Sequence, residues 1–224
     1  MKIQIYSHKT PEDALNSADL GVDFIGVAVG ELGRLPAEVS FSSCRNIFSA
    51  IPAGSHASRV ALTVASDPDE IIETIRMVSP DVLHLSGDIN CMSLEKVAEL
   101  RAVAHDVKIM QAIPVKDETS IALALAYQQV SDYLILDTDV DTFTGIGATG
   151  SCHDWSISRK IVLAVNIPII LAGGLSPLNV ANAISMVRPW CVDSFTHTNK
   201  ANSRTKDSSK IHSFIGAARN WPSK

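Results

Sequence analysis

The stretch that decides the fold is Pro168-Ile169-Ile170-Leu171-Ala172-Gly173-Gly174-Leu175-Ser176-Pro177. Its apolar run, Ile169–Ala172, is typical of a short buried strand. The Gly-Gly pair then marks a turn, and Ser176-Pro177 places a capping residue before a proline, which predicts a helix start. A strand followed directly by a helix is the unit from which parallel sheets are built.

The same alternation runs along the whole chain. Short runs rich in Val, Ile or Leu alternate with segments of helical spacing. Helix starts are predicted at Thr10-Pro11-Glu12-Asp13, at Ser66-Asp67-Pro68 and at Asp154-Trp155-Ser156, because each puts a capping residue at the first turn. The predicted strands are Ile3–Tyr6, Phe24–Val29, Val60–Val64, Val82–Leu85, Ile109–Ile113, Tyr133–Leu136, Ile169–Ala172 and Cys191–Ser194.

Eight strand–helix units in 224 residues give 28 residues per unit. Short βα units connect through right-handed crossovers and form parallel sheets. Eight of them close a (β/α)8 TIM barrel, whereas an open doubly wound sheet of five or six strands would leave units over. The pattern favours one barrel domain over residues 1–224. Its active site is expected at the carboxyl ends of the strands.

Composition agrees with this fold and excludes several classes of protein. The chain is 46% apolar, 19% charged and only 5% aromatic, so we expect an ordered protein with an aliphatic core. The net charge is −5 and no basic block is present, which argues against nucleic-acid binding.

No segment predicts a membrane span, a secretory signal or a cysteine-based site. The most apolar stretch, 161–175, is interrupted by Asn166 and Pro168 and is shorter than the roughly 20 residues that a span requires. No C-x-x-C pair occurs, so a zinc ribbon or a thioredoxin-type site is not expected. We predict a cytoplasmic protein with four free thiols, at Cys44, Cys91, Cys152 and Cys191.

Polar side chains stand at the ends of the first and fourth strands. Alternation along a strand puts Tyr6 on the inner face of the barrel and turns its apolar neighbours toward the helices. The same rule points His84 and Ser86 inward. A neutral histidine at the barrel mouth is a candidate acid or base.

Carboxylates end the sixth and eighth strands. Asp137 closes an otherwise apolar run, and an acid in that place must be hydrated, paired or catalytic. Asp193 is a second acid near the mouth. The glycine-rich loop 144–150, after the sixth strand, is a candidate lid or anion nest, although it lacks the Lys of a P-loop.

Three further features are candidates for binding anions. Gly173-Gly174 after the seventh strand exposes backbone N–H groups, and the loops after strands seven and eight form the usual phosphate site of this fold. Thr196, after the eighth strand, is a hydroxyl candidate for the same site. Arg34, in the loop after the second strand, is a candidate to bind a carboxylate with its forked guanidinium.

Taken together, these residues resemble the phosphoribosylanthranilate isomerase family, which are small TIM barrels of the ribulose-phosphate-binding type. The resemblance covers nearly the whole chain. It is carried by Lys9–Ala14, Leu83–Asp88, Leu136-Asp137, Gly147–Gly150, Asp154-Trp155, Leu171–Pro177, Asn179-Val180, Val192-Asp193 and Lys206-Asp207.

The resemblance implies an isomerase of tryptophan biosynthesis that acts on a small phosphorylated substrate. The family reaction is an Amadori rearrangement, in which a general acid opens an aminoaldose phosphate and a general base removes its C2 proton. By resemblance, Asp137 stands at the position of the acid, and Arg34 lies near the arginine that holds the anthranilate carboxylate. No cofactor and no metal are expected, and the protein is expected to be a monomer or a homodimer.

The sequence departs from the family at the base and at the eighth loop. The family places Cys in the strand-one motif Lys-Ile-Cys-Gly, where this chain has Tyr6. A phenol with an ordinary pKa near 10 is a poor base at neutral pH. The family's strand-four pair, Gln and His, is His84 and Ser86 here, and its loop Ser-Ser-Gly-Val-Glu is Phe195–Asn199, which lacks the Gly and is bulkier.

Three hypotheses follow from these similarities and departures. The first is an isomerase in which Tyr6 or His84 replaces the thiol as the base. The second is a barrel that binds a phosphorylated molecule without this chemistry. The third is a different enzyme on the same barrel. A metal-dependent epimerase would need ligands such as His84, Asp137 and Asp193, and a Schiff-base lyase would need a lysine inside the barrel, for which Lys108 and Lys116 flank the fifth strand.

Overall fold

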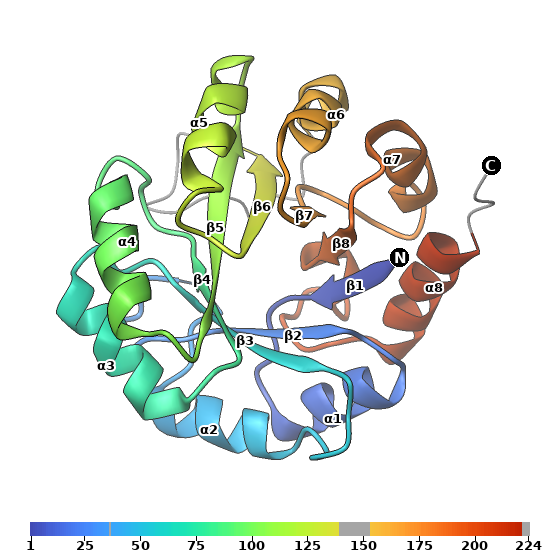
Figure 1. The fold of residues 1–224 in the computed structure, drawn as a ribbon. Helices are drawn as coiled ribbons and strands as arrows, with labels where there is room; N and C mark the ends of the chain where they lie inside the picture. Colours follow the sequence, from blue (N-terminus) through green and yellow to red (C-terminus); the bar gives the residue numbers. More distant parts are fainter. Residues whose placement is uncertain (36, 139–152, 221–224) are drawn as a thin grey trace.

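A computed structural model of the protein describes residues 1–35, 37–138 and 153–220. Eight parallel strands form a closed barrel in the order in which they occur along the chain, and the helices surround it (Figure 1). All eight predicted strands and the predicted TIM barrel are confirmed. The strands are β1 (Lys2–Ile5), β2 (Phe24–Ala28), β3 (Ser58–Thr63), β4 (Val82–Leu85), β5 (Lys108–Val115), β6 (Tyr133–Thr138), β7 (Ile169–Leu171) and β8 (Cys191–Ser194). The helices are α1 (Pro11–Asp19), α2 (Phe41–Ser49), α3 (Pro68–Val78), α4 (Leu94–Val103), α5 (Thr119–Tyr127), α6 (Trp155–Ala164), α7 (Val180–Val187) and α8 (Ser208–Arg219), with a 3-10 helix at Thr196–Thr198.

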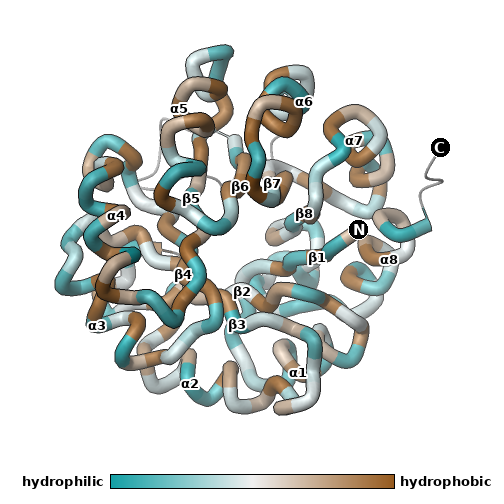
Figure 2. The backbone as a smooth tube through the Cα atoms, in the orientation of Figure 1, coloured by the Kyte–Doolittle hydropathy of each residue, from teal (hydrophilic) through white to brown (hydrophobic). Residues whose placement is uncertain are grey.

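Two apolar layers follow from the alternation along each strand. Leu83 and Leu85 of β4 pack in the layer between barrel and helices, whereas Tyr6 belongs to a smaller cluster inside the barrel. Figure 2 shows hydrophobic residues along the strands and mixed colouring along the surrounding helices. Pairing of β1 with β8 places Gln4 beside Asp193, so the ring closes near the predicted site.

Three of the predicted helix starts are confirmed by their caps. The Thr10 hydroxyl accepts a hydrogen bond from the Asp13 amide (3.1 Å), and Asp154 caps α6 at the Ser156 amide (2.8 Å). In the third, Asp67 rather than Ser66 is the cap, and Pro68 is the first residue of α3.

The start predicted at Ser176-Pro177 is wrong, because α7 begins at Val180. The Ser176 amide donates to Asn179 Oδ1 (2.7 Å), and Asn179 Nδ2 donates to the Gly174 carbonyl (3.0 Å). These hydrogen bonds hold residues 176–179 in a turn. Asn side chains can bond to nearby backbone groups in this way and so compete with the hydrogen bonds of a helix.

No helix in the described part of the chain is long and apolar enough to cross a membrane.

Candidate active site

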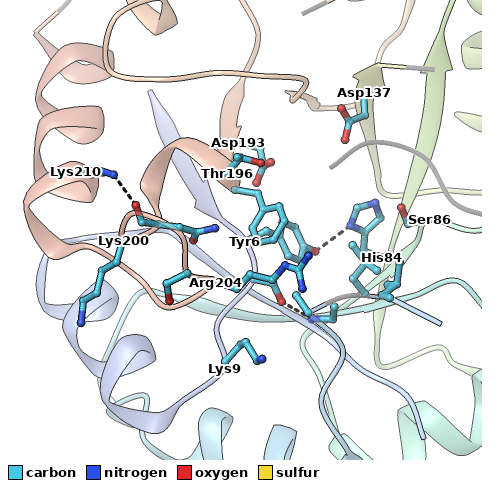
Figure 3. Close-up of a pocket in the computed structure, with 18 of the residues that line it drawn as sticks. Tyr6, Lys9, His84, Ser86, Asp137, Asp193, Thr196, Lys200, Arg204 and Lys210 are labelled. Atoms are coloured by element: carbon cyan, nitrogen blue, oxygen red, sulfur yellow. Dashed lines mark hydrogen bonds between the residues drawn. The ribbon is translucent and has the colours of Figure 1, made fainter. Parts of the chain in front are cut away.

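A cavity of about 870 Å³ opens at the carboxyl ends of the strands, where the fold predicts the active site. Its walls come from the ends of β1, β3, β4, β6 and β8 and from the segment that leads to α8. The structure brings together six polar residues predicted from the sequence (Figure 3). They are Tyr6, His84, Ser86, Asp137, Asp193 and Thr196.

Tyr6 and His84, which the alternation along β1 and β4 points inward, form a buried pair at the cavity. Their Oη and Nδ1 atoms are 2.9 Å apart, and their ring centroids are 5.5 Å apart. Burial lowers the pKa of His84 to about 3, because the cavity wall disfavours an imidazolium. Burial and the nearby Asp193 carboxylate raise the pKa of Tyr6 well above its usual value. Both rings are therefore neutral at pH 7.

His84 also has a polar atom directed away from the pair. Its Nε2 is buried and has no hydrogen-bond partner among the described residues. With the proton on Nε2, Nδ1 accepts the hydrogen bond from the Tyr6 hydroxyl. In that tautomer the Tyr6 hydroxyl is the donor of the hydrogen bond that joins the two rings.

Gly26 in β2 makes room for the Tyr6 ring, a role that the sequence did not reveal. A Cβ at Gly26 would lie 2.2 Å from Tyr6 Cε1. A contact that short is impossible without movement of the ring or the strand. The glycine therefore fixes where Tyr6 lies at the cavity wall.

The Gly26→Ala substitution is expected to destabilise the protein by about 1–3 kcal/mol, the usual effect of overpacking. It should also move the Tyr6 ring away from His84. Chemical denaturation of Gly26→Ala, Tyr6→Ala and the double variant measures the coupling between the two sites. Tyr6→Ala removes the ring with which the new methyl group clashes. Adding Gly26→Ala to Tyr6→Ala should therefore lower the free energy of unfolding by less than about 0.5 kcal/mol, which is on the order of the measurement error. An equal cost in both backgrounds would contradict this packing role.

Two carboxyl groups with raised pKa values face the cavity. Burial raises the pKa of Asp137 to about 7, although the Thr138 amide donates to its Oδ1 (2.7 Å) and lowers the pKa in part. Burial, and then the charge of Asp137, raise the pKa of Asp193 to about 8. An acid with a pKa near neutrality is suited to give a proton during catalysis. Asp137 therefore has the chemistry of a general acid.

Gly173 and Gly174 form a tight turn after β7, as predicted from the Gly-Gly pair. Their φ angles are +82° and +64°, which favour glycine. A Cβ at Gly173 would lie 2.6 Å from Thr138 Oγ1, so this turn packs closely on β6. The two glycines line a small hollow together with Thr196 and both carboxyl groups. This is the arrangement expected of a phosphate site at the seventh and eighth strands.

Arg34 lies outside the cavity lining. Its Nη1 and Nη2 atoms bind the two carboxylate oxygens of Glu70 at 2.8 and 3.0 Å. Glu38 fixes the same loop by accepting hydrogen bonds from four consecutive amides, 32 to 35. Arg34 thus binds a carboxylate through both terminal nitrogens, as its candidate role requires, but that carboxylate is the Glu70 side chain and not a ligand.

Sequence reasoning missed Lys206, which lies under the site. Its ammonium donates to Asn199 Oδ1 (2.6 Å) and to the Tyr6 carbonyl, and it lies 5.0 Å from the Phe195 ring centroid. Burial lowers its pKa to about 7, against the attraction of Asp193 and Asp13. In the sequence, Lys206 is quoted only as part of the resemblance at Lys206-Asp207, and no pattern there predicts that its side chain is buried.

The remaining predicted features lie elsewhere. Cys44 and Cys191 are buried free thiols and Cys91 is an exposed one, and none of them lines the cavity. Cys152 and the glycine-rich loop 144–150 lie outside the described residues. Within the described ranges, no cluster of three His, Cys, Asp or Glu residues is arranged to hold a metal. Lys108 starts β5 at the opposite end of the barrel and pairs with Asp132, so it is not placed to form the Schiff base that a lyase would need.

Comparison with known proteins agrees with this geometry. The family model described as N-(5'phosphoribosyl)anthranilate (PRA) isomerase matches residues 11–217. The chain is 35% identical to the N-(5'-phosphoribosyl)anthranilate isomerase of Haloferax volcanii, over 94% of this chain and 90% of that protein. It is 33% identical to that of Methanocella arvoryzae, over 97% and 98% of the two chains.

Solved structures show the same architecture. Phosphoribosyl anthranilate isomerase from Thermotoga maritima superposes with a TM-score of 0.81 at 27% identity, and 98% of each chain is covered. A phosphoribosyl anthranilate isomerase in complex with reduced 1-(o-carboxyphenylamino)-1-deoxyribulose 5-phosphate gives 0.79 at 26% identity, again over 98% of each chain. With its barrel, its acid at the end of β6 and this match over nearly its whole length, the chain belongs to the N-(5'-phosphoribosyl)anthranilate isomerase family.

Proposed function

We propose that this protein isomerises a phosphorylated aminoaldose to an aminoketose, with phosphoribosylanthranilate as substrate. The observation that carries the proposal is Asp137, which lines the cavity with a pKa raised to about 7 and which, by resemblance, corresponds to the family's acid. The proposed setting is tryptophan biosynthesis in the cytoplasm, without cofactor or metal. The direct test is conversion of phosphoribosylanthranilate by the purified protein, followed by chromatography of the product.

In the proposed first step, protonated Asp137 gives its proton to the ring oxygen of the sugar. The bond between C1 and that oxygen breaks, and the amine nitrogen forms a double bond to C1 as its lone pair moves in. Asp137 becomes a carboxylate, and the ring is open. A pKa near 7 leaves a large protonated fraction at neutral pH, so this acid is available without further activation.

In the second step, Tyr6 and His84 together take the place of the thiol. We propose that Tyr6 Oη accepts the C2 proton while its own proton passes to Nδ1 of His84, 2.9 Å away. The electron pair of the C2–H bond moves to neutralise the iminium, which gives an enolamine that tautomerises to the ketone. The substrate phosphate and carboxylate carry negative charge, which favours the imidazolium that this relay produces.

One observation favours the second candidate function, a barrel that binds a phosphorylated molecule without converting it. Because the pKa of His84 is lowered to about 3, its imidazole is a weak base before substrate is bound, and because the pKa of Tyr6 is raised, its side chain is a neutral phenol and not a phenolate. A protein that binds a phosphosugar but does not convert phosphoribosylanthranilate would fit this candidate. The conversion assay separates it from the isomerase.

Both candidates predict that ribose 5-phosphate binds at the Gly173-Gly174 turn. At 100 times its dissociation constant, the ligand should raise the free energy of unfolding by about 2.7 kcal/mol. A thermal melt should then shift by roughly 5–11 °C for a domain of this size. Gly173→Ala should abolish the shift, because its φ is +82° and its Cβ would meet Thr138 Oγ1.

The matched control is Gly54→Ala, at a glycine with open space around its Cβ position. That variant should keep the full ligand-induced shift. No shift in the unmodified protein, or an equal shift in Gly173→Ala, would contradict a phosphate site at this turn.

A further inference from the structure

The buried side chain of Lys206 contacts the backbone of Tyr6. Lys206 is 3% exposed, and its ammonium donates hydrogen bonds to the Tyr6 carbonyl and to Asn199 Oδ1 (2.6 Å). Both acceptors are uncharged, so neither contact is a salt bridge. Burial of an amine costs free energy that an apolar side chain of similar size would avoid. Lys206 is therefore a candidate for a role other than packing.

The carbonyl that Lys206 binds lies just past the end of a strand. β1 ends at Ile5, and the next amide, that of Tyr6, donates to the Ser194 carbonyl of β8 at 3.0 Å. The Tyr6 carbonyl accepts its hydrogen bond from the Lys206 ammonium. A buried carbonyl without a partner is costly, so loss of the ammonium would let this peptide group move toward another donor.

The backbone of Lys206 is itself held from two directions. Its amide donates to Asp13 Oδ2 of α1 (3.3 Å), and the residue forms an antiparallel bridge with Asn199. The following amide, that of Asp207, donates to the Thr198 carbonyl (3.0 Å). The ammonium is thus presented from a fixed backbone, which a residue that positions another one requires.

The position of the Tyr6 backbone decides where its hydroxyl lies. The ring packs on Gly26, where a Cβ would lie 2.2 Å from Tyr6 Cε1. At the far end of the ring, Oη is 2.9 Å from Nδ1 of His84, a contact that Figure 3 draws as a dashed line. A displacement at the carbonyl is carried through the ring to this contact, because the ring is rigid.

We propose that Lys206 is the positioning residue of Tyr6: its ammonium holds the Tyr6 carbonyl and thereby keeps the hydroxyl in contact with Nδ1 of His84. Lys206 is not among the described residues that line the cavity, so it acts through Tyr6 and not on a ligand. The geometric part of this inference is independent of the reaction. Its consequence for turnover rests on the proposed function, in which the Tyr6 hydroxyl accepts the C2 proton.

Nitrogen-15 NMR of the protein labelled at histidine measures the contact between Tyr6 and His84 directly. The Nδ1 resonance of His84 is assigned by its loss in His84→Asn, and Tyr6→Phe gives its position without the hydrogen bond. Lys206→Met keeps a side chain of similar length but has no donor. It should move the resonance from its position in the unmodified protein toward that in Tyr6→Phe.

Lys210→Met is the matched control, because Lys210 donates to the Asn199 carbonyl (2.7 Å) of the same segment and not to Tyr6. It should leave the His84 resonance in place. A resonance unchanged in Lys206→Met, or moved equally in both variants, would overturn the inference. If Lys206→Met does not fold, Lys206→Gln, whose side chain is one atom shorter, gives the same test. Failure of both variants to fold, while Lys210→Met folds, would also overturn it, since Lys206 would then be purely structural.

Turnover gives a second readout. Lys206→Met should lower kcat for phosphoribosylanthranilate by about 10–100-fold, because a small displacement of a reacting group costs this much. KM should change less than about twofold, because the substitution leaves the cavity lining intact. In the Tyr6→Phe background the same substitution should lower kcat less than about twofold, because the hydroxyl through which Lys206 acts is then absent.

The two readouts separate the inference from the proposed function. If the unmodified protein does not convert phosphoribosylanthranilate but Lys206→Met moves the His84 resonance, the proposed function fails and the inference stands. If the unmodified protein converts the substrate and Lys206→Met leaves both the resonance and kcat unchanged, the inference fails and the proposed function stands. An equal loss of kcat with and without Tyr6→Phe would also contradict the inference, because Lys206 would then act independently of the Tyr6 hydroxyl.

Discussion

Replacing Asp137 with Asn is expected to lower kcat for phosphoribosylanthranilate by about 10²–10⁴, the usual contribution of a general acid. Asn has nearly the same shape but no proton of suitable acidity, so KM should change little. Steady-state kinetics measures both constants. Asp106→Asn, at a carboxylate that is exposed and remote from the site, is the matched control and should keep full activity. Full activity in Asp137→Asn would remove the basis of the proposed function.

The same residue should set the pH dependence of the reaction. Because the acid must be protonated, kcat/KM should fall as pH rises through about 7, the pKa of Asp137. In Asp137→Asn this alkaline limb should be absent from the residual activity. A limb at the same pH in both proteins would assign the ionisation to another group.

Asp137 also affects stability in a direction that can be worked out. Its folded pKa of about 7 lies above the ordinary value of 3.8, so the folded state binds the proton more tightly than the unfolded state. Its contribution is fully present below about pH 4 and is lost as pH rises through about 7. Between pH 5 and pH 8 the unmodified protein should therefore lose free energy of unfolding that Asp137→Asn does not lose. The difference in stability between the two proteins should thus move in favour of the variant as pH rises. Denaturant melts at the two pH values measure the difference.

Tyr6→Phe is the second change with a large expected effect, a loss of about 10²–10⁴ in kcat. It removes the hydroxyl that accepts the C2 proton and leaves Nδ1 of buried His84 without the partner it has at 2.9 Å. The unpaired nitrogen should also lower the free energy of unfolding by about 1–3 kcal/mol. Steady-state kinetics and denaturant melts measure these two effects independently.

Two further variants separate the relay from a purely structural role. His84→Asn combined with Tyr6→Phe should lose no more activity than either substitution alone, because residues that act as one unit are not additive. Tyr6→Cys should retain more activity than Tyr6→Phe, because a thiol has an ordinary pKa nearer to 7 than a phenol. The relay would be contradicted if the loss of kcat in the double variant equalled the product of the two single losses. It would also be contradicted if kcat were unchanged in Tyr6→Phe.

The sequence predicted the barrel well because its signals are local. Runs such as Val82–Leu85 and Ile169–Ala172 show their burial in their own composition, and alternation within them pointed Tyr6, His84 and Ser86 inward as observed. Asp137 stood out because an acid ended an apolar run. Where a local competitor was present, the prediction failed: the Asn179 side chain holds a turn, and α7 begins later than Ser176-Pro177 suggests.

Contacts between distant segments could not be predicted in the same way. Arg34 follows Gly33 in the loop after β2, and nothing near it in the sequence indicates that Glu70, 36 positions later, binds its guanidinium. Gly26 resembles any glycine in a strand until the Tyr6 ring is seen against it. The lysines and arginine after β8 occur in a polar stretch with the composition of an ordinary connecting loop.

The sequence by itself determined the eight-unit barrel and the end of the barrel that carries the cavity, since the burial and spacing that produce them are present in each short segment. Tertiary structure alone decided the proton affinities of that site. Closing the ring brings Tyr6, His84, Asp137 and Asp193 from the ends of four strands to the wall of one cavity, where their side chains are buried. There, loss of water and mutual charge, which no local pattern contains, set the protonation of each group.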